Sequence, residues 1–158
     1  ATAHRLLFST PELSAPLHLS GTARVTLRLA VDRPAANLSV WLVSLPWEEA
    51  TEGERTPPTA NVVTRGWADP RNRASTTEEE PLQAGEFVTV SFDLQPDDQI
   101  LPPGQRLGLM VLSSDRDFTL HARPGTELTL DLAGSVLELP VVGGAAALTK
   151  ATGGVPGG

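Results

Sequence analysis

The sequence has no cysteine, no tyrosine and a single methionine, Met110. The absence of cysteine excludes disulfide bonds, thiolate metal sites and thiol redox chemistry within these 158 residues. It does not identify the cellular compartment, because a domain of this size can form a stable core without covalent cross-links. Size alone therefore suggests one domain with one hydrophobic core.

The sequence also lacks a long apolar run and an excess of basic residues. Its formal net charge is −7, which makes attraction to nucleic acid or to an anionic membrane surface unfavourable. No apolar stretch approaches the ~20 residues that cross a bilayer, and the first residues do not resemble a signal peptide. We expect no nucleic-acid partner and no membrane partner. Because the numbering begins at Ala1, we also expect a processed or excised part of a longer protein.

Helical periodicity is scarce, whereas period-two alternation is common. Val25, Leu27, Leu29 and Val31 alternate with polar residues, which is typical of a strand with one wet face. The same alternation returns in residues 87–94 and 128–132. Residues 38–45 and 107–112 are apolar at nearly every position, which predicts strands covered on both faces. Shorter strands are expected at residues 6–9, 17–20, 61–67 and 136–142.

The 14 prolines and 14 glycines separate these segments with turns. Eight to ten short strands without crossover helices predict an all-β fold, a jelly-roll β-sandwich. We expect this domain to cover residues 1–142, with one helical turn after Asp69-Pro70. Residues 143–158 are rich in glycine and alanine, and we expect them to form a flexible tail.

The sequence contains none of the motifs that supply the catalytic groups of a hydrolase. No serine lies in the G-x-S-x-G elbow that presents a nucleophile, and Ser135 in Ala-Gly-Ser-Val-Leu is better explained by a turn. His4, His18 and His121 lack the spacing of zinc ligands. We therefore predict no catalytic residue, no metal ligand and no cofactor.

Acidic pairs offer the oxygen ligands that calcium prefers. Asp97-Asp98 and Asp115 with Asp117 are such pairs. Aspartates also bind their own backbone in turns, and this second explanation is the stronger one.

Three tryptophans occur in a chain with only four phenylalanines: Trp41, Trp47 and Trp67. Trp67 lies among arginines at the expected end of a strand, with Arg65 before it and Arg71 and Arg73 after it. Arginine and tryptophan are enriched at buried interfaces, because each combines a large contact area with directed polar groups. These residues are our candidates for a contact surface.

The order of several segments resembles the C-terminal domain of X-Pro dipeptidyl-peptidases and of the related cocaine esterases and α-amino-acid ester hydrolases. The segments that carry the resemblance are Leu6-Leu7-Phe8-Ser9-Thr10, Leu17-His18-Leu19-Ser20-Gly21-Thr22, Val25 to Val31, Ala36-Asn37-Leu38, Arg65-Gly66-Trp67, Pro81-Leu82-Gln83-Ala84-Gly85-Glu86, Leu94-Gln95-Pro96-Asp97-Asp98, Pro102-Pro103-Gly104-Gln105-Arg106-Leu107 and Ser113-Ser114-Asp115. The acidic loop from Glu48 to Pro58 departs from the family pattern.

The resemblance implies a jelly roll of the galactose-binding type that carries no catalytic group itself. It implies an upstream α/β-hydrolase domain in the same polypeptide, which would hold the catalytic Ser, Asp and His and act on peptide substrates by releasing N-terminal X-Pro dipeptides. The domain would pack on that hydrolase domain, with Arg65, Trp67, Arg71 and Arg73 as the interdomain contact. The compartment stays open between a bacterial cytoplasm and secretion, and a homo-oligomer stays open too.

A second hypothesis is a carbohydrate-binding jelly-roll module, because sandwich folds are shared with lectin-like domains and aromatic side chains stack on sugar rings. Fold analogy is its only support. The absence of tyrosine and the apolar surroundings of Trp41 argue against it.

Overall fold

The computed structural model describes residues 5–47, 61–113, 115, 118–119 and 123–154. The acidic loop from Glu48 to Pro58 lies outside these residues. The elements, in chain order, are β1 (Arg5–Ser9), β2 (Leu17–Gly21), β3 (Arg24–Val31), β4 (Leu38–Leu45), β5 (Val62–Ala68), the 3₁₀ turn η1 (Pro70–Asn72), β6 (Phe87–Asp93), β7 (Asp97–Leu101), β8 (Arg106–Leu112), β9 (Leu128–Glu138) and α1 (Gly144–Ala151).

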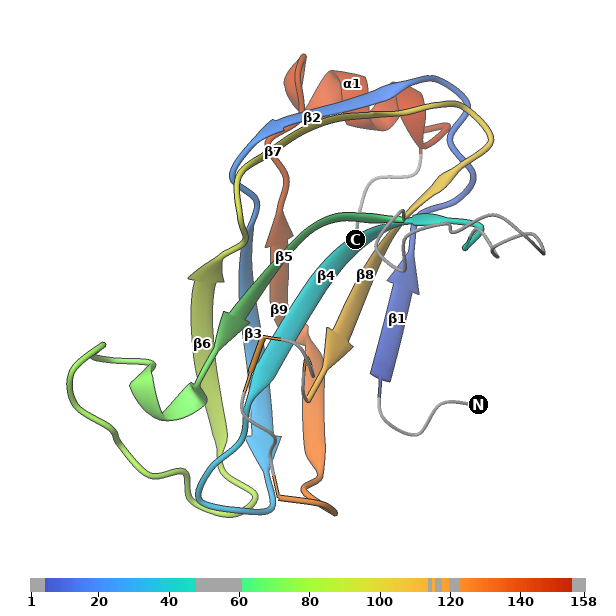
Figure 1. Cartoon of the computed structure of the whole chain (residues 1–158). Helices are drawn as coiled ribbons and strands as arrows, with labels where there is room; N and C mark the ends of the chain where they lie inside the picture. Colours follow the sequence, from blue (N-terminus) through green and yellow to red (C-terminus); the bar gives the residue numbers. More distant parts are fainter. Residues whose placement is uncertain (1–4, 48–60, 114, 116–117, 120–122, 155–158) are drawn as a thin grey trace, which may run out of the picture.

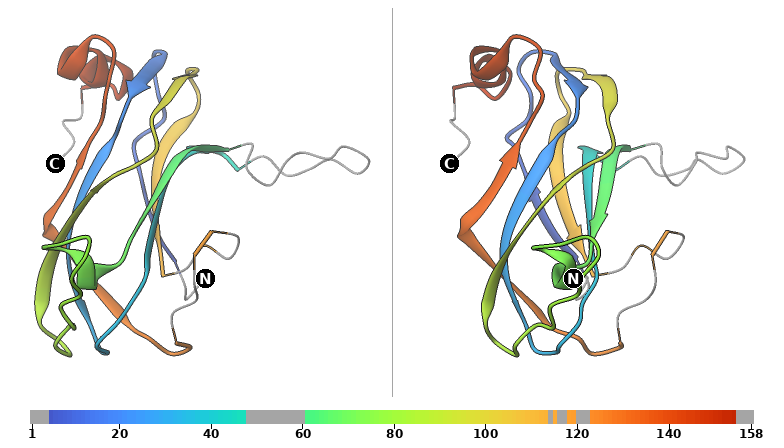
Figure 2. Two further views of the ribbon diagram at one scale, coloured as in Figure 1. Left: turned by 60° about the vertical axis from the view of Figure 1, so that its left-hand side comes forward. Right: turned by 90° about the vertical axis from the view of Figure 1, so that its left-hand side faces the viewer.

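The strands form an all-β sandwich of two layers (Figures 1 and 2). One layer is a four-stranded sheet in the order β1-β8-β4-β5, and the other is a three-stranded sheet in the order β6-β3-β9. Every strand pairing is antiparallel. The chain crosses between the layers at β3 to β4, at β5 to β6 and at β8 to β9. These crossings confirm the jelly-roll sandwich expected from the alternating sequence.

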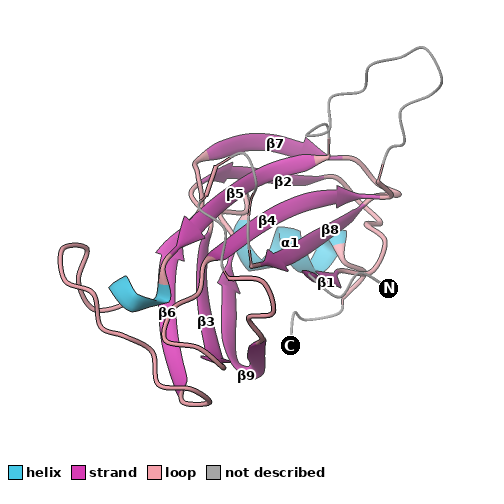
Figure 3. Ribbon diagram, turned by 60° about the horizontal axis from the view of Figure 1, so that its bottom comes forward, coloured by secondary structure: helices cyan, strands magenta, loops and turns pink. Residues whose placement is uncertain are grey.

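The short pair β2 and β7 extends the three-stranded sheet. The pairing of β3 with β6 begins at Arg24↔Asp93, and the pairing of β2 with β7 ends at Gly21↔Asp97, so the two pairings adjoin. Between them the amide of Leu94 donates to the carbonyl of Ala23 at 2.8 Å. β2 with β3 and β6 with β7 thus form one long curved ladder, which Figure 3 shows arching over the end of the sandwich. β7 was not expected from the sequence.

The core lies between the two layers. Leu27 and Leu29 of β3 face Val40 and Leu42 of β4, and all four side chains are fully buried. Burial of such apolar surface is the main stabilising contribution to the fold. Val43 and Met110 are also buried but lie outside the core cluster. β4 and β8 are therefore covered on both faces, as their continuous apolar sequence predicts.

β9 carries a wide bulge at the edge of the three-stranded sheet. Its pairing with β3 shifts between Thr26↔Val136 and Arg28↔Asp131, so several residues of β9 oppose Leu27 alone. The bulge is closed by side chains: the hydroxyl of Ser135 donates to the carbonyl of Asp131 at 2.7 Å and accepts from the amide of Arg28 at 3.0 Å. The bulge therefore joins residues 128–132 to residues 136–138, which we expected to belong to two separate strands.

We expected residues 143–158 to form a flexible tail, and this prediction is wrong for the described residues 143–154. Residues Gly144–Ala151 form α1, which covers the end of the sandwich beside β2 (Figure 1). Ala151 is fully buried in the core cluster, and the Ser14 amide donates to the Ala151 carbonyl at 2.8 Å. Gly143 adopts a φ of 87° that favours glycine and starts the helix. The glycine- and alanine-rich composition predicted a flexible segment, because composition alone does not show that this helix packs against the sandwich.

No described helix has the length and apolar character needed to cross a bilayer.

Candidate functional site

The outward face of β4 and β5 brings the predicted contact residues Arg65 and Trp67 beside Trp41. Trp41 pairs directly with Arg65, and Ser39 pairs with Trp67, so the three large side chains share the face that points away from the core. Strand alternation places them there, since Val40 and Leu42 of the same strand enter the core. With Asp115 and Phe118, which follow β8, these residues form what we call the β5 cluster.

Asp115 is the centre of the β5 cluster. It is only 5% exposed, and its Oδ2 accepts hydrogen bonds from Nε1 of Trp41 at 3.2 Å and from Nε1 of Trp67 at 3.1 Å. A guanidinium nitrogen of Arg65 lies 3.6 Å from the same oxygen. Three donors from two strands therefore converge on one carboxylate oxygen, and such a buried carboxylate must be held by partners.

Phe118 covers the arginine from outside. The guanidinium carbon of Arg65 lies 3.9 Å from the centre of the Phe118 ring, and the rings of Phe118 and Trp67 stack with their centres 5.4 Å apart. Cation–π attraction and ring stacking both favour this arrangement. Despite these contacts Phe118 remains 55% exposed. The β5 cluster therefore presents an aromatic surface with its one positive charge paired beneath it.

A hollow of about 300 Å³ lies next to the cluster. Its lining residues are Asn37, Leu38, Trp67, Ala68, Asp69 and Thr119. Three of these residues are apolar and three are polar. Trp67 belongs both to this lining and to the β5 cluster, so the hollow adjoins the cluster.

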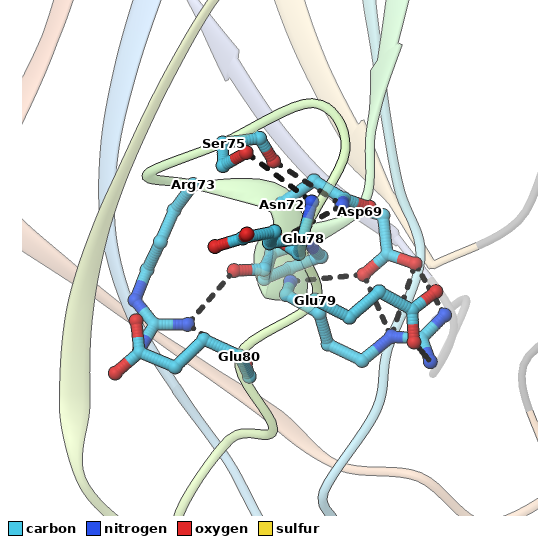
Figure 4. A network of polar contacts seen from close by, with 9 residues as sticks. Asp69, Asn72, Arg73, Ser75, Glu78, Glu79 and Glu80 are labelled. Carbon is cyan, nitrogen blue, oxygen red and sulfur yellow. Dashed lines mark hydrogen bonds and ion pairs between the residues drawn. The ribbon is translucent and has the colours of Figure 1, made fainter.

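The other two predicted contact residues, Arg71 and Arg73, lie in the loop after β5 and are engaged within it. Arg71 forms a two-pronged contact with Asp69 and an ion pair with Glu79 at 2.7 Å. The hydrogen bond with Asp69 raises the pKa of Arg71 further above its already high usual value. Arg73 forms an ion pair with Glu80 at 2.7 Å, and the two side chains lie beside each other in Figure 4.

Asp69 also caps η1, accepting from the amide of Arg71 at 2.9 Å. This short helical turn after Asp69-Pro70 is the one that the sequence predicts. The loop that carries Arg71 and Arg73 is thus fixed by its own ion pairs, next to the end of β5.

The remaining sequence candidates occupy ordinary structural positions. His18 of β2 contacts Asp98 of β7 diagonally at 2.6 Å, and the hydroxyl of Ser20, which lies directly opposite Asp98, donates to it at 3.2 Å. Neither bond joins serine to histidine, as a nucleophile–base pair would require. Ser135 lies in the β9 bulge. Among the described residues, no three His, Asp or Glu side chains gather as a metal site would need. His4, Asp117 and His121 lie outside the described residues.

Sequence analysis did not foresee the roles of Asp115 and Phe118. In the sequence Asp115 is recognisable only as one residue of an acidic pair, and Phe118 belongs to no motif. The two residues reach Trp67 by folding back over the sheet after β8, a long-range contact that no local pattern encodes. The one available signal was the excess of tryptophan and arginine in β4 and β5, whose indole and guanidinium groups need an acceptor when covered.

Comparison with known proteins gives consistent results. A family model described as the X-Pro dipeptidyl-peptidase C-terminal non-catalytic domain matches residues 1–152. A protein of Rhodopirellula baltica, provisionally named Xaa-Pro dipeptidyl-peptidase, is 61% identical over 143 residues, which cover 90% of this chain and 22% of that protein. A Bacillus cereus protein with the same provisional name is 34% identical over 140 residues, covering 89% of this chain and 22% of its own length.

Among solved structures, an α-amino acid ester hydrolase aligns with a TM-score of 0.69 and 21% identity, over 88% of this chain and 26% of that one. This likeness supports the fold and nothing further. The chain spans about a fifth of the length of the curated relatives that it matches.

Proposed function

The chain belongs to the family of X-Pro dipeptidyl-peptidase C-terminal non-catalytic domains, and from this membership we propose that it serves a larger serine hydrolase that releases N-terminal X-Pro dipeptides. In this proposal the domain contributes no reacting group. It packs on an upstream α/β-hydrolase domain of the same polypeptide and helps to shape the path of the peptide substrate. The galactose-binding subtype of its fold remains a prediction.

The match over residues 1–152 to a non-catalytic domain carries this proposal. The length of the relatives points the same way, since a chain that covers 22% of a relative leaves most of that relative for other domains. The carbohydrate-binding alternative has no comparable support, so we do not propose it.

We propose that Arg65, Trp67, Arg71 and Arg73 belong to the interdomain contact, with two different tasks. Arg65 and Trp67 lie on the outward face of β5 and would touch the hydrolase domain. Arg71 and Arg73 are largely occupied by acidic partners of their own loop. They would hold this loop in the shape that the contact requires.

Hydrolysis of an X-Pro chromogenic substrate tests the proposal. We expect the 158-residue chain alone to be inactive and the full-length polypeptide to be active. A full-length variant with the nucleophilic serine of its upstream domain replaced by alanine is the matched control, and we expect it to be inactive. Activity of the isolated chain, or an inactive wild-type full-length polypeptide, would contradict the proposal.

A further inference from the structure

We propose that Phe118 is the anchor by which this domain docks into an apolar pocket of the catalytic domain of its own polypeptide, and that Asp115 is the residue that positions this anchor. The inference rests on the proposed function, because it requires a catalytic domain in the same polypeptide. It adds to the four predicted contact residues a fifth that sequence analysis missed, and it states the chemistry of the partner surface.

The exposure of Phe118 is the first observation. One face of its ring is covered by Arg65 and Trp67, yet the side chain remains 55% exposed. A large aromatic ring in water forgoes the burial that makes such side chains stabilising. Phe118 stacks on Trp67 and precedes Thr119, and both of these residues line the hollow. A protruding ring next to a recess is the shape complement of a surface with a pocket and a neighbouring apolar side chain.

The second observation is how firmly Phe118 is placed. The amides of Phe118 and Thr119 both donate to the carbonyl of Asp115, at 3.0 and 2.8 Å, and the Thr119 hydroxyl accepts from the Asp115 amide at 3.0 Å. These bonds tie Phe118 and Thr119 to Asp115, whose carboxylate in turn contacts the sheet through Trp41 and Trp67. A buried ion pair contributes little to stability compared with apolar packing, but it can specify one geometry. The geometry specified here is the outward direction of Phe118.

Charge indicates what kind of partner fits. The centres of protein interfaces are poor in charged residues and rich in aromatic residues and arginine. Asp115 neutralises the guanidinium of Arg65, and Phe118 covers it, so the surface presented by the cluster is aromatic and close to neutral. A partner that recognised a free arginine would be acidic. The paired arginine instead favours an uncharged, apolar pocket.

The length of the relatives points to the catalytic domain as the occupant. The curated relatives extend over more than four times the length that this chain covers, and the matching family is named for the C-terminal part of such proteins. β1, the first described strand, is the other edge strand of the sheet that carries the cluster (Figure 1).

Site-specific photo-cross-linking in the full-length polypeptide tests the inference. The variant Phe118→p-benzoylphenylalanine places a reactive ring at the proposed anchor. The matched control is Ile100→p-benzoylphenylalanine on β7, because Ile100 is 58% exposed and apolar but lies away from the cluster. Peptide mapping should show cross-links from position 118 to the catalytic domain of the same polypeptide, at least tenfold more abundant than from position 100. Cross-links that join two copies, or equal yields from both positions, would overturn the inference.

The role of Asp115 needs a readout that folding alone does not change. Adding Asp115→Asn to the position-118 cross-linker should reduce the yield at least fivefold while the far-ultraviolet circular dichroism of the protein is retained, and Asp115→Glu should restore part of it. An unchanged yield with Asp115→Asn would remove its positioning role. The outcome is independent of the proposed activity. If the Phe118→p-benzoylphenylalanine variant cross-links as described while the wild-type polypeptide releases no X-Pro dipeptide, the proposed function is refuted and the docking is left intact.

Discussion

Removal of the Asp115 carboxylate should destabilise the 158-residue chain far more than removal of an exposed carboxylate. In Asp115→Ala, the indole N–H of Trp67 loses the acceptor that the structure gives it, whereas Trp41 retains a hydrogen bond to the Ser39 hydroxyl at 3.1 Å. Arg65 loses its counter-ion while remaining mostly covered. An unsatisfied buried donor costs about 1–3 kcal/mol, and breaking a buried ion pair costs about 3–5 kcal/mol.

Because Arg65 keeps some contact with water and its stacking on Phe118, the free energy of unfolding should fall by about 2–4 kcal/mol. Urea unfolding followed by tryptophan fluorescence measures this loss, and the midpoint should fall by roughly 1–2 M. The control is Asp98→Ala, since Asp98 is an exposed partner of His18, and its midpoint should change little. Adding Arg65→Met should recover part of the loss by removing the unpaired charge. A shift with Asp115→Ala no larger than that with Asp98→Ala would refute this reasoning.

Three further predictions follow from packing, charge and the terminal helix. Gly66→Ala should lower the urea midpoint, because an added Cβ would lie 2.9 Å from the carbonyl oxygen of Asp93 and 2.8 Å from Leu94; an unchanged midpoint would contradict the close approach of β5 and β6. The hydrogen bond from His18 lowers the pKa of Asp98 in the folded protein. The pair should therefore stabilise the fold at a pH above the pKa of an unfolded aspartate, and this stabilisation should be lost as the pH falls through the lowered pKa of Asp98. Carboxyl titration by NMR should show the lowered pKa of Asp98, and His18→Leu should raise that pKa again. Ala151→Asp should lower the melting temperature, because it places a carboxylate in the core, whereas Ala145→Asp on the exposed side of the helix should not.

The strands were predictable where the sequence alternates or is continuously apolar. Residues 38–45 predict β4 with its observed bounds, and the alternation from Val25 to Val31 predicts β3 to within one residue. These patterns are local, because burial of one or both faces of a strand imposes them directly. Trp67 and Arg65, which the sequence analysis singled out, also lie together in the β5 cluster.

What sequence did not predict depends on contacts between distant residues. Asp97-Asp98 was interpreted as part of a turn, yet these residues begin β7 because the partner strand β2 provides the pairing. α1 forms from a glycine- and alanine-rich segment because Ala151 and the Ser14 contact stabilise it from outside. Asp115 and Phe118 reach Trp67 in the same way, through the path of the chain after β8.

The bulge in β9 has a consequence for how the molecule behaves at high concentration. β9 is the border strand of its sheet and exposes Leu132 and Val136, which are 59% and 56% accessible to water. A straight border strand with such side chains would be a template for sheet-to-sheet aggregation, and an irregular one interrupts the regular row of donors and acceptors that an incoming strand needs. The insertion between Asp131 and Ser135 therefore breaks the regular row of backbone donors and acceptors along β9 and leaves its apolar side chains in place.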